Sequence, residues 1–188
     1  MERRGLQYDR ALLKPLMAGK SIQEGVVIMK RYFPVDEPDA VLSEERMQLI
    51  SGLFEEEVNF IPGFIRFHEA LMHERISTCI ATSMHPALMP KIDKRLNIKR
   101  LFEGRVYHVA DAGNRSKPDP AVFLYAARKM NVRPEQCLVI EDAPHGIAAA
   151  KSAGMSCWSI TTTFQSSLLM QADRVFANFD QIAADFFG

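Results

Sequence analysis

The segment from Asp119 to Ile160 reads DPAVFLYAARKMNVRPEQCLVIEDAPHGIAAAKSAGMSCWSI and contains two kinds of apolar pattern. In its first part, Phe123, Ala126, Ala127 and Met130 recur at the spacing of one helix face. The Asp-Pro pair in front of them is a frequent helix start, because proline is tolerated at the first helical position. The segment therefore opens with a predicted amphipathic helix.

The same segment continues with a strand, a second helix and a second strand. Residues 137–140 form a continuous apolar run, which is typical of a parallel strand covered on both faces. A helix around Ile147 follows and is expected to end at Gly154. Residues 155–160 form the next apolar run. This strand–helix–strand order with short connections predicts a doubly wound parallel sheet.

The alternation of helices and strands extends to both sides of this segment. A helix with a buried stripe is predicted from Phe64, and the apolar runs 76–81 and 106–109 are predicted strands. Another short strand is predicted at 174–176. Residues 58–188 are therefore expected to form an α/β core of the Rossmann-like, doubly wound parallel type.

The residues before this core carry only helical signals. One helix is predicted over 22–32, where Pro34 closes it, and another is predicted to open at Ser43. The pattern changes near Pro62. We therefore expect a small helical unit over residues 1–57.

The bulk composition excludes several classes of protein. Of the 188 residues, 47% are apolar and 24% charged, and basic and acidic residues balance. A zero net charge argues against nucleic-acid binding, which normally needs a basic surface. No run approaches the ~18 consecutive apolar residues of a membrane span, and no apolar signal core follows Met1. We expect a cytoplasmic protein with no membrane partner.

The three cysteines agree with a reducing compartment. Cys79, Cys137 and Cys157 are odd in number, far apart, and each lies in an apolar strand-like run. We interpret them as buried reduced thiols rather than catalytic or metal-binding groups.

Polar side chains follow three of the predicted strands. Thr82 and Ser83 follow one strand, Lys117 lies in the loop after the next, and Glu141 and Asp142 follow a third. Open parallel sheets bind ligands at the carboxyl ends of their strands. Adjacent carboxylates suit Mg²⁺, which also takes phosphate oxygens, while lysine and hydroxyls bind the phosphate itself. The sequence therefore predicts a site for Mg²⁺ and a phosphate group.

Each of these groups has a structural alternative. Thr82 and Ser83 could be turn residues, Lys117 a solvated loop lysine, and the two carboxylates favourable charges at a helix N-terminus. The coincidence of all three groups on one rim favours function. His145 is more often a first-turn residue than an acid or base at such a position, and is left out of the site.

Two motifs connect the sequence to a known family. The run SKPDP at Ser116–Pro120 and the run VIEDAPHGIAAAKSAGM at Val139–Met155 resemble the haloacid dehalogenase superfamily, most closely its β-phosphoglucomutase-like and sugar-phosphatase branch. Ala81-Thr82-Ser83 after a strand is similar to the second family motif. Gly19-Lys20-Ser21 resembles the substrate-facing loop of the family's helical cap. The resemblance covers the chain from about Pro62 to its end, and more loosely the helical first part.

The resemblance implies a function and a role for each rim residue. The chain would be a Mg²⁺-dependent phosphohydrolase acting on a small phosphorylated metabolite, a sugar-phosphate-like phosphomonoester, through an aspartyl-phosphate. Thr82 would bind the transferring phosphoryl group, with Ser83 as a second candidate. Lys117 would bind the same group and offset its charge. Glu141 and Asp142 would hold Mg²⁺, directly or through water.

One family motif is absent from the chain. Family members begin with a strand that ends in Asp-x-Asp, whose first aspartate attacks phosphorus and whose second acts as acid and base. Here no aspartate has another two positions on, and only Met1 to Leu6 precede the cap-like helices. We therefore expect the nucleophile and the central strand to be missing, which would leave the neighbouring strands without hydrogen-bonding partners.

Three explanations of this absence stay open. The chain could be a truncated or alternatively started form of an active enzyme. It could be a pseudoenzyme that binds Mg²⁺ and a phosphorylated ligand, or another chain or segment could supply the strand. The first is favoured, because binding alone gives no obvious reason to keep Thr82, Lys117, Glu141 and Asp142 together.

Two other activities are less favoured. Phosphosugar mutases of this branch carry an arginine shortly after the cap-loop glycine, whereas Lys20 and then Ile22 follow Gly19 here. A dinucleotide-binding oxidoreductase would need a Gly-x-Gly-x-x-Gly turn after a strand, and the sequence has none.

Overall fold

The structure is a computed structural model that describes residues 4–7, 9–56 and 58–188. The expected boundary residue Glu57 and the N-terminal residues Met1 to Arg3 lie outside the described residues. Helices come first along the chain, and strands alternate with helices afterwards. The first four helices are α1 (Arg10–Met17), α2 (Ile22–Tyr32), α3 (Asp39–Glu56) and α4 (Phe64–His73).

Local signals explain where the second and third helices begin. The hydroxyl of Ser21 accepts from the backbone N–H of Glu24, whose carboxylate accepts from the N–H of Ser21 in return. This capping box starts α2 at the predicted residue. The predicted start of α3 at Ser43 is wrong, because the carbonyl of Pro38 already accepts from the N–H groups of the first turn. Asp39 places a favourable negative charge there.

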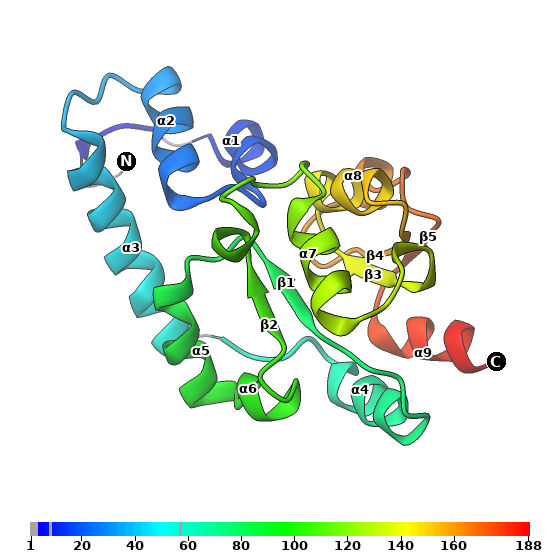
Figure 1. Ribbon diagram of the computed structural model, residues 1–188. Coiled ribbons are helices and arrows are strands. Elements are labelled where there is room, and N and C mark those ends of the chain that lie inside the picture. The colour runs from blue at the N-terminus through cyan, green and yellow to red at the C-terminus, as the bar shows by residue number, and fades with distance from the viewer. Residues whose placement is uncertain (1–3, 8, 57) are drawn as a thin grey trace.

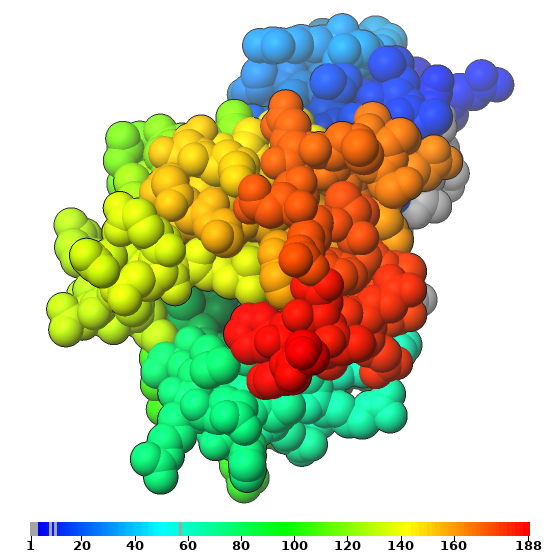
Figure 2. Space-filling view, turned by 90° about the vertical axis from the view of Figure 1, so that its right-hand side faces the viewer, coloured from blue at the N-terminus to red at the C-terminus, as the bar shows by residue number. Residues whose placement is uncertain are grey.

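The helices before residue 57 lie together along one side of the molecule (Figure 1). α3 runs beside α5 (Met89–Leu96), and α1 packs against the loop that follows the fourth strand. In that second contact the ammonium of Lys14 donates to the backbone carbonyl of Thr163. Figure 2 shows the N-terminal residues in blue resting on the orange segment around this loop.

Within the described residues, five strands form two parallel sheets. β1 (Ile80–Thr82) pairs with β2 (Val106–His108), and β3 (Leu138–Glu141) pairs with β4 (Ser156–Ile160), which pairs with β5 (Arg174–Phe176). All pairs are parallel, as the strand–helix–strand rhythm predicted. The helices of this half are α6 (Ile98–Leu101), α7 (Ala121–Met130), α8 (Pro144–Ser152) and α9 (Phe179–Phe187).

Both faces of the larger sheet are covered. Val139 and Cys157 pack into one core cluster with α7 and α8, and Ile140 and Trp158 pack into another with α4 and α9. Neighbouring residues of a strand point to opposite faces, so a strand buried on both sides must be apolar throughout. This confirms the doubly wound α/β fold predicted from the apolar runs.

The sheet is interrupted between β1 and β3. Among the described residues, no strand pairs with either the free edge of β1 or the free edge of β3. The two edges are connected through a side chain, since the Lys117 ammonium contacts Ala81 at the end of β1 and Glu141 at the end of β3. In the described residues the sheet is therefore in two pieces.

Two strand predictions were only partly right. The run 76–81 yields a strand only from Ile80, because β2 begins at Val106, after a turn at Gly104 with φ of 75°. Residues before Ile80 therefore have no ladder partner on that side. The strand predicted at 137–140 begins one residue later and includes Glu141.

The cysteines are all free thiols, but only one is fully buried. Cys157 is buried, whereas Cys79 and Cys137 are partly exposed, so the prediction of three buried thiols was wrong for two of them. Burial raises the pKa of Cys157 to about 12 and that of Cys79 to about 11. Neither supplies much thiolate at neutral pH.

Among the described residues, no helix is long and apolar enough to cross a membrane.

Candidate active site

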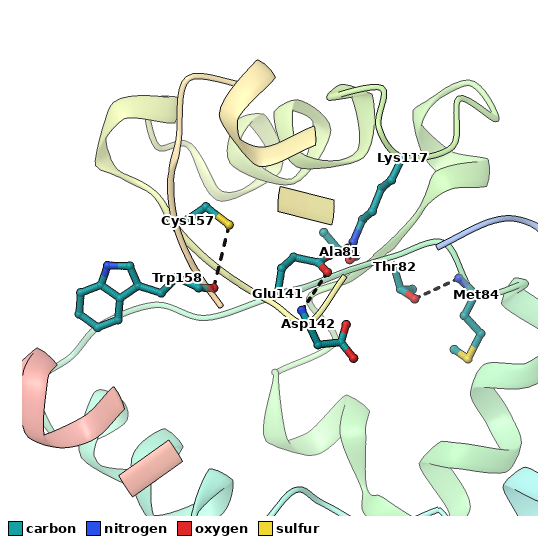
Figure 3. Close-up of polar contacts among 8 residues, drawn as sticks. All are labelled: Ala81, Thr82, Met84, Lys117, Glu141, Asp142, Cys157 and Trp158. Carbon is teal, nitrogen blue, oxygen red and sulfur yellow. Dashed lines mark hydrogen bonds and ion pairs between the residues drawn. The ribbon is translucent and has the colours of Figure 1, made fainter. Parts of the chain in front are cut away.

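The first part of the site is the end of β1. Thr82 is the last residue of this strand, and its hydroxyl accepts a hydrogen bond of 3.0 Å from the backbone N–H of Met84 (Figure 3). That bond leaves the hydroxyl proton of Thr82 available to a ligand. The hydroxyl oxygen of Ser83 is buried and has no hydrogen-bond partner among the described residues.

The second part is a buried lysine. Lys117 lies in the loop before α7 and is only 6% exposed. Its ammonium forms an ion pair with the Glu141 carboxylate, lies 3.4 Å from the carbonyl oxygen of Ala81, and sits 4.6 Å from the ring centre of Phe123. Figure 3 shows the side chain reaching from its loop to the ends of both edge strands. The structure thus holds the cation with three different partners.

The third part is the pair of carboxylates at the end of β3. One oxygen of Glu141 accepts from Lys117, and the other lies 3.2 Å from the backbone N–H of Asp142. The Asp142 carboxylate points away from this pair and accepts from the hydroxyl of Thr163, in the loop after β4. The two carboxylates therefore have different partners and face different directions.

A glycine makes room for the Glu141 side chain. A Cβ atom on Gly146 would lie less than 3.0 Å from all three atoms of the Glu141 carboxyl group. Gly146 lies in the first turns of α8 and its φ is not in the left-handed region. Close approach, rather than backbone conformation, therefore explains this glycine.

We expect Gly146→Ala to destabilise the protein by about 1–3 kcal/mol, because the new methyl group forces the buried Glu141 carboxylate away from Lys117. Gly52→Ala in α3 is the matched control, since nothing lies within 4 Å of its added Cβ atom. That variant should be as stable as the parent or gain up to about 1 kcal/mol. Urea unfolding followed by circular dichroism measures both, and equal stabilities of the two variants would contradict the close approach.

All five predicted site residues line one cavity. Its volume is about 590 Å³, and Thr82, Ser83, Lys117, Glu141 and Asp142 are among its lining residues. Apolar side chains line much of the remainder: Ile50, Phe54, Ile61, Ile80, Ile140, Ile160 and Phe179. A largely apolar cavity with a few convergent polar groups is typical of a small-molecule site.

Several neighbours of these residues were not predicted from the sequence. Thr163 follows β4 by three residues, so the same rule of strand ends could have found it. Gly146 leaves room for the Glu141 side chain, and the ring of Phe123 contacts the Lys117 ammonium. No local sequence pattern indicates either contact. From the sequence, Lys20 was assigned only to the cap-like loop. In the structure its ammonium lies 3.3 Å from the carbonyl oxygen of Lys117.

His145 stays outside the cavity lining. Burial, and then the charge of Lys20, lower its pKa, and its Nδ1 has no hydrogen-bond partner among the described residues. It lies in the first turn of α8, as the structural alternative predicted.

The two carboxylates alone make a small donor set for a metal. Among the described residues, no group of three or more His, Cys, Asp or Glu side chains could hold a metal ion. Mg²⁺ is commonly bound by one or two carboxylates together with water and phosphate oxygens. The hard oxygens of Asp142 and Glu141, beside a cavity large enough for a phosphate, fit that kind of site.

Together, the fold and this geometry define a Rossmann-like α/β domain whose polar site lies at the carboxyl ends of its strands. Comparison with known families gives a match to haloacid dehalogenase-like hydrolases over residues 23–154. The chain therefore belongs to this family of hydrolase enzymes, as its two motifs indicated.

Individual relatives carry phosphatase and mutase names. The chain is 28% identical to hexitol phosphatase A of Escherichia coli over 154 residues, which are 81% of this chain and 70% of the relative. It is 41% identical to β-phosphoglucomutase of Bacillus subtilis over 113 residues, 60% of this chain and 47% of the relative. Two other curated relatives are matched over only 34% and 49% of their lengths. The match thus spans about half or less of several of these relatives.

The overall structure is similar to that of a hydrolase from Pseudomonas syringae, with a TM-score of 0.85 and 23% identity over 99% of this chain and 86% of the other. At 23% sequence identity, this structural similarity shows that the two chains share a fold.

Proposed function

We propose that the cavity is the phosphoryl site of a Mg²⁺-dependent phosphohydrolase whose ligand is a small phosphomonoester of the sugar-phosphate type. The observation that carries this proposal is the buried Lys117–Glu141 ion pair, which lies in one cavity with Thr82 and Asp142. A buried charge is costly unless it has a partner, so a lysine kept beside a ligand cavity suits an anionic ligand. The names of the relatives support a sugar phosphate.

Three side chains would bind the phosphoryl group. The Thr82 hydroxyl can donate to a phosphate oxygen, since its own hydrogen bond to Met84 uses only its acceptor side. The buried Ser83 hydroxyl gains a partner when a ligand is present. Lys117 supplies positive charge to the same oxygens, and Glu141 and Phe123 fix the position of its ammonium.

Asp142 and Glu141 would hold Mg²⁺. The Asp142 carboxylate lines the cavity and is oriented by the Thr163 hydroxyl, so it is the better placed direct ligand. Glu141 is engaged with Lys117 and would contribute through water or by orienting that lysine. When bound, Mg²⁺ supplies charge stabilisation at the phosphoryl oxygens.

The helical residues 1–57 would act as a cap over the site, and residues 58–188 would form its core. Lys20 supports this arrangement, because its ammonium reaches the backbone of Lys117 from the start of α2. Lys14 makes a second contact of this kind, because its ammonium donates to the backbone carbonyl of Thr163, the residue whose hydroxyl orients Asp142.

The attacking carboxylate is not provided by the described cavity lining. Asp142 is the sole aspartate among the described residues that line the cavity, and the sequence holds no Asp-x-Asp. We propose that this chain binds Mg²⁺ and the phosphorylated ligand, and that turnover requires a carboxylate placed between β1 and β3. A non-catalytic protein that binds a phosphorylated ligand is the second candidate, favoured by the same interruption of the sheet.

Phosphate release tests this proposal. The chain, and a version preceded by an apolar strand ending in Asp-x-Asp, are assayed on p-nitrophenyl phosphate and a panel of hexose and hexitol phosphates, with and without Mg²⁺. We expect Mg²⁺-dependent turnover from the extended version and none above background from the chain alone.

Two results would revise the proposal. Turnover by the chain alone would mean that a residue of this chain acts as nucleophile. No turnover by either version, together with Mg²⁺-dependent binding of the same ligands, would favour the non-catalytic binding protein.

A further inference from the structure

The loop after β4 connects α1 with one of the proposed metal ligands. Its Phe164 is 7% exposed and packs into the core cluster that contains Ile147. A buried ring of this size fixes the backbone next to it, where Thr163 lies. The loop is therefore anchored in the core at the point where it contacts both α1 and the carboxylate of Asp142.

Lys14 makes two contacts with this loop from α1. Its ammonium donates to the backbone carbonyl of Thr163 and lies 5.1 Å from the ring centre of Phe164. The preceding residue, Leu13, is only 1% exposed, so this turn of α1 is packed against the rest of the protein. An ammonium held in this way fixes the direction of the Thr163 carbonyl. The directions open to the hydroxyl of the same residue are limited as a result.

The hydroxyl of Thr163 acts on Asp142. It donates to Oδ2 of that carboxylate, which follows β3 and lines the cavity. The hydrogen bond fixes the plane of the carboxylate and leaves Oδ1 for a metal ion. Partners of this kind hold a metal ligand in the geometry that the ion needs, and loss of one typically lowers metal affinity about 10–100-fold. Thr163 is therefore placed to set the affinity of the site without contacting the ion.

Local structure does not account for these two contacts. Threonine hydroxyls in loops often bond to backbone groups a few residues away. Here the hydroxyl of Thr163 bonds to a carboxylate 21 positions earlier in the chain, and its carbonyl accepts from a lysine 149 positions earlier. Both contacts are long-range, and a single residue joins them.

We propose that Thr163 and Lys14 are positioning residues of the metal site: Lys14 holds Thr163, and Thr163 holds Asp142 in the orientation that binds Mg²⁺. This inference rests on the proposed Mg²⁺ site and adds that the docking of α1 raises the affinity of that site. Coupling between two sites is reciprocal, so bound Mg²⁺ in turn strengthens the docking of α1. Both directions can be measured without turnover.

Calorimetric titration of the full chain with Mg²⁺ alone measures the first direction. Thr163→Val keeps the shape of the side chain but removes its donor, and we expect it to weaken Mg²⁺ binding about tenfold or more. Thr163→Ser retains the hydroxyl and should keep most of the affinity. Thr162→Val, at the neighbouring exposed position, is the matched control and should bind Mg²⁺ as the parent does.

The sign of the Lys14 effect separates positioning from charge. Lys14→Met is expected to weaken Mg²⁺ binding about fivefold or more. Removal of a positive charge near the site would by itself strengthen the binding of a cation. Combined with Thr163→Val, the substitution should weaken binding little further, because Lys14 acts through Thr163. Arg31→Met, at an exposed position of α2, removes the same charge elsewhere and should leave the affinity unchanged.

Hydrogen exchange measures the reverse direction. The amides of residues 10–17 are followed by mass spectrometry in Mg²⁺ and in EDTA, and we expect slower exchange in Mg²⁺ for the parent chain. Thr163→Val and Asp142→Asn should both lose this difference. A contact that only supported the fold would change the exchange rate equally with and without the metal.

The outcomes separate this inference from the proposed function. If the parent chain binds no Mg²⁺, the metal site itself is wrong, and this inference with it. If the parent binds Mg²⁺ but Thr163→Val binds it as tightly, or Lys14→Met binds it as tightly or more tightly, only the positioning role is wrong. Equal exchange of α1 with and without Mg²⁺ in the parent would also contradict that role. Circular dichroism shows whether each variant is folded, and Lys14→Gln serves if Lys14→Met is not.

Discussion

Lys117→Ala is expected to remove detectable phosphomonoester binding and to destabilise the protein by about 3–5 kcal/mol. The first effect follows because the lysine is the cation held beside the proposed phosphoryl position. The second follows because the side chains of Lys117 and Glu141 are only 8% and 11% exposed. Without the lysine, a carboxylate stays buried with no cation beside it. Urea unfolding and calorimetric titration measure the two effects.

A double substitution separates stability from binding. Lys117→Met combined with Glu141→Met replaces the ion pair with apolar groups and should recover much of the lost stability, while binding stays lost. Lys99→Ala, at an exposed position of α6, is the control and should change stability by no more than about 0.5 kcal/mol. A Lys117→Ala variant as stable as this control would contradict the buried ion pair.

Ile147→Ala is expected to destabilise the protein by about 2–5 kcal/mol. Ile147 is fully buried in the core cluster that joins α8 to β3 and β4, where it lies with Val122 and Cys157. Its truncation leaves a cavity beneath the helix that carries Gly146. The position of the Glu141 side chain is disturbed as a result. Thermal and urea unfolding measure the loss.

An exposed leucine gives the matched comparison for this core substitution. Leu124 in α7 is 41% exposed, so Leu124→Ala removes a similar volume without opening a buried cavity. We expect a loss below about 1 kcal/mol. Equal losses of stability for the two variants would mean that Ile147 is not part of the core that supports the site.

Strong local signals predicted much of the fold from the sequence. The proline after Phe33 marked the end of α2, and the apolar runs located β4 and β5 within one residue. The candidate site followed from topology alone. The carboxyl ends of parallel strands meet at one edge, so residues at the ends of β1 and β3 were expected to converge there.

Other features depend on contacts that no local pattern contains. The start of α3 was misplaced, because the carbonyl of Pro38, five residues before the expected cap at Ser43, already closes its first turn. The short β1 depends on where its neighbour β2 begins. The approach of Arg46 to Gly25 brings together residues of two helices that are 21 positions apart in the sequence. Such contacts are set by tertiary packing.

The most direct test of the phosphoryl site is a calorimetric titration of the chain with fructose 1-phosphate, in Mg²⁺ and in EDTA, alongside Asp142→Asn. We expect binding in Mg²⁺ that weakens about 10–100-fold in EDTA and in the variant. Equal affinity with and without Mg²⁺, or an Asp142→Asn variant that binds as the parent does, would contradict a metal-assisted phosphoryl site at the ends of β1 and β3.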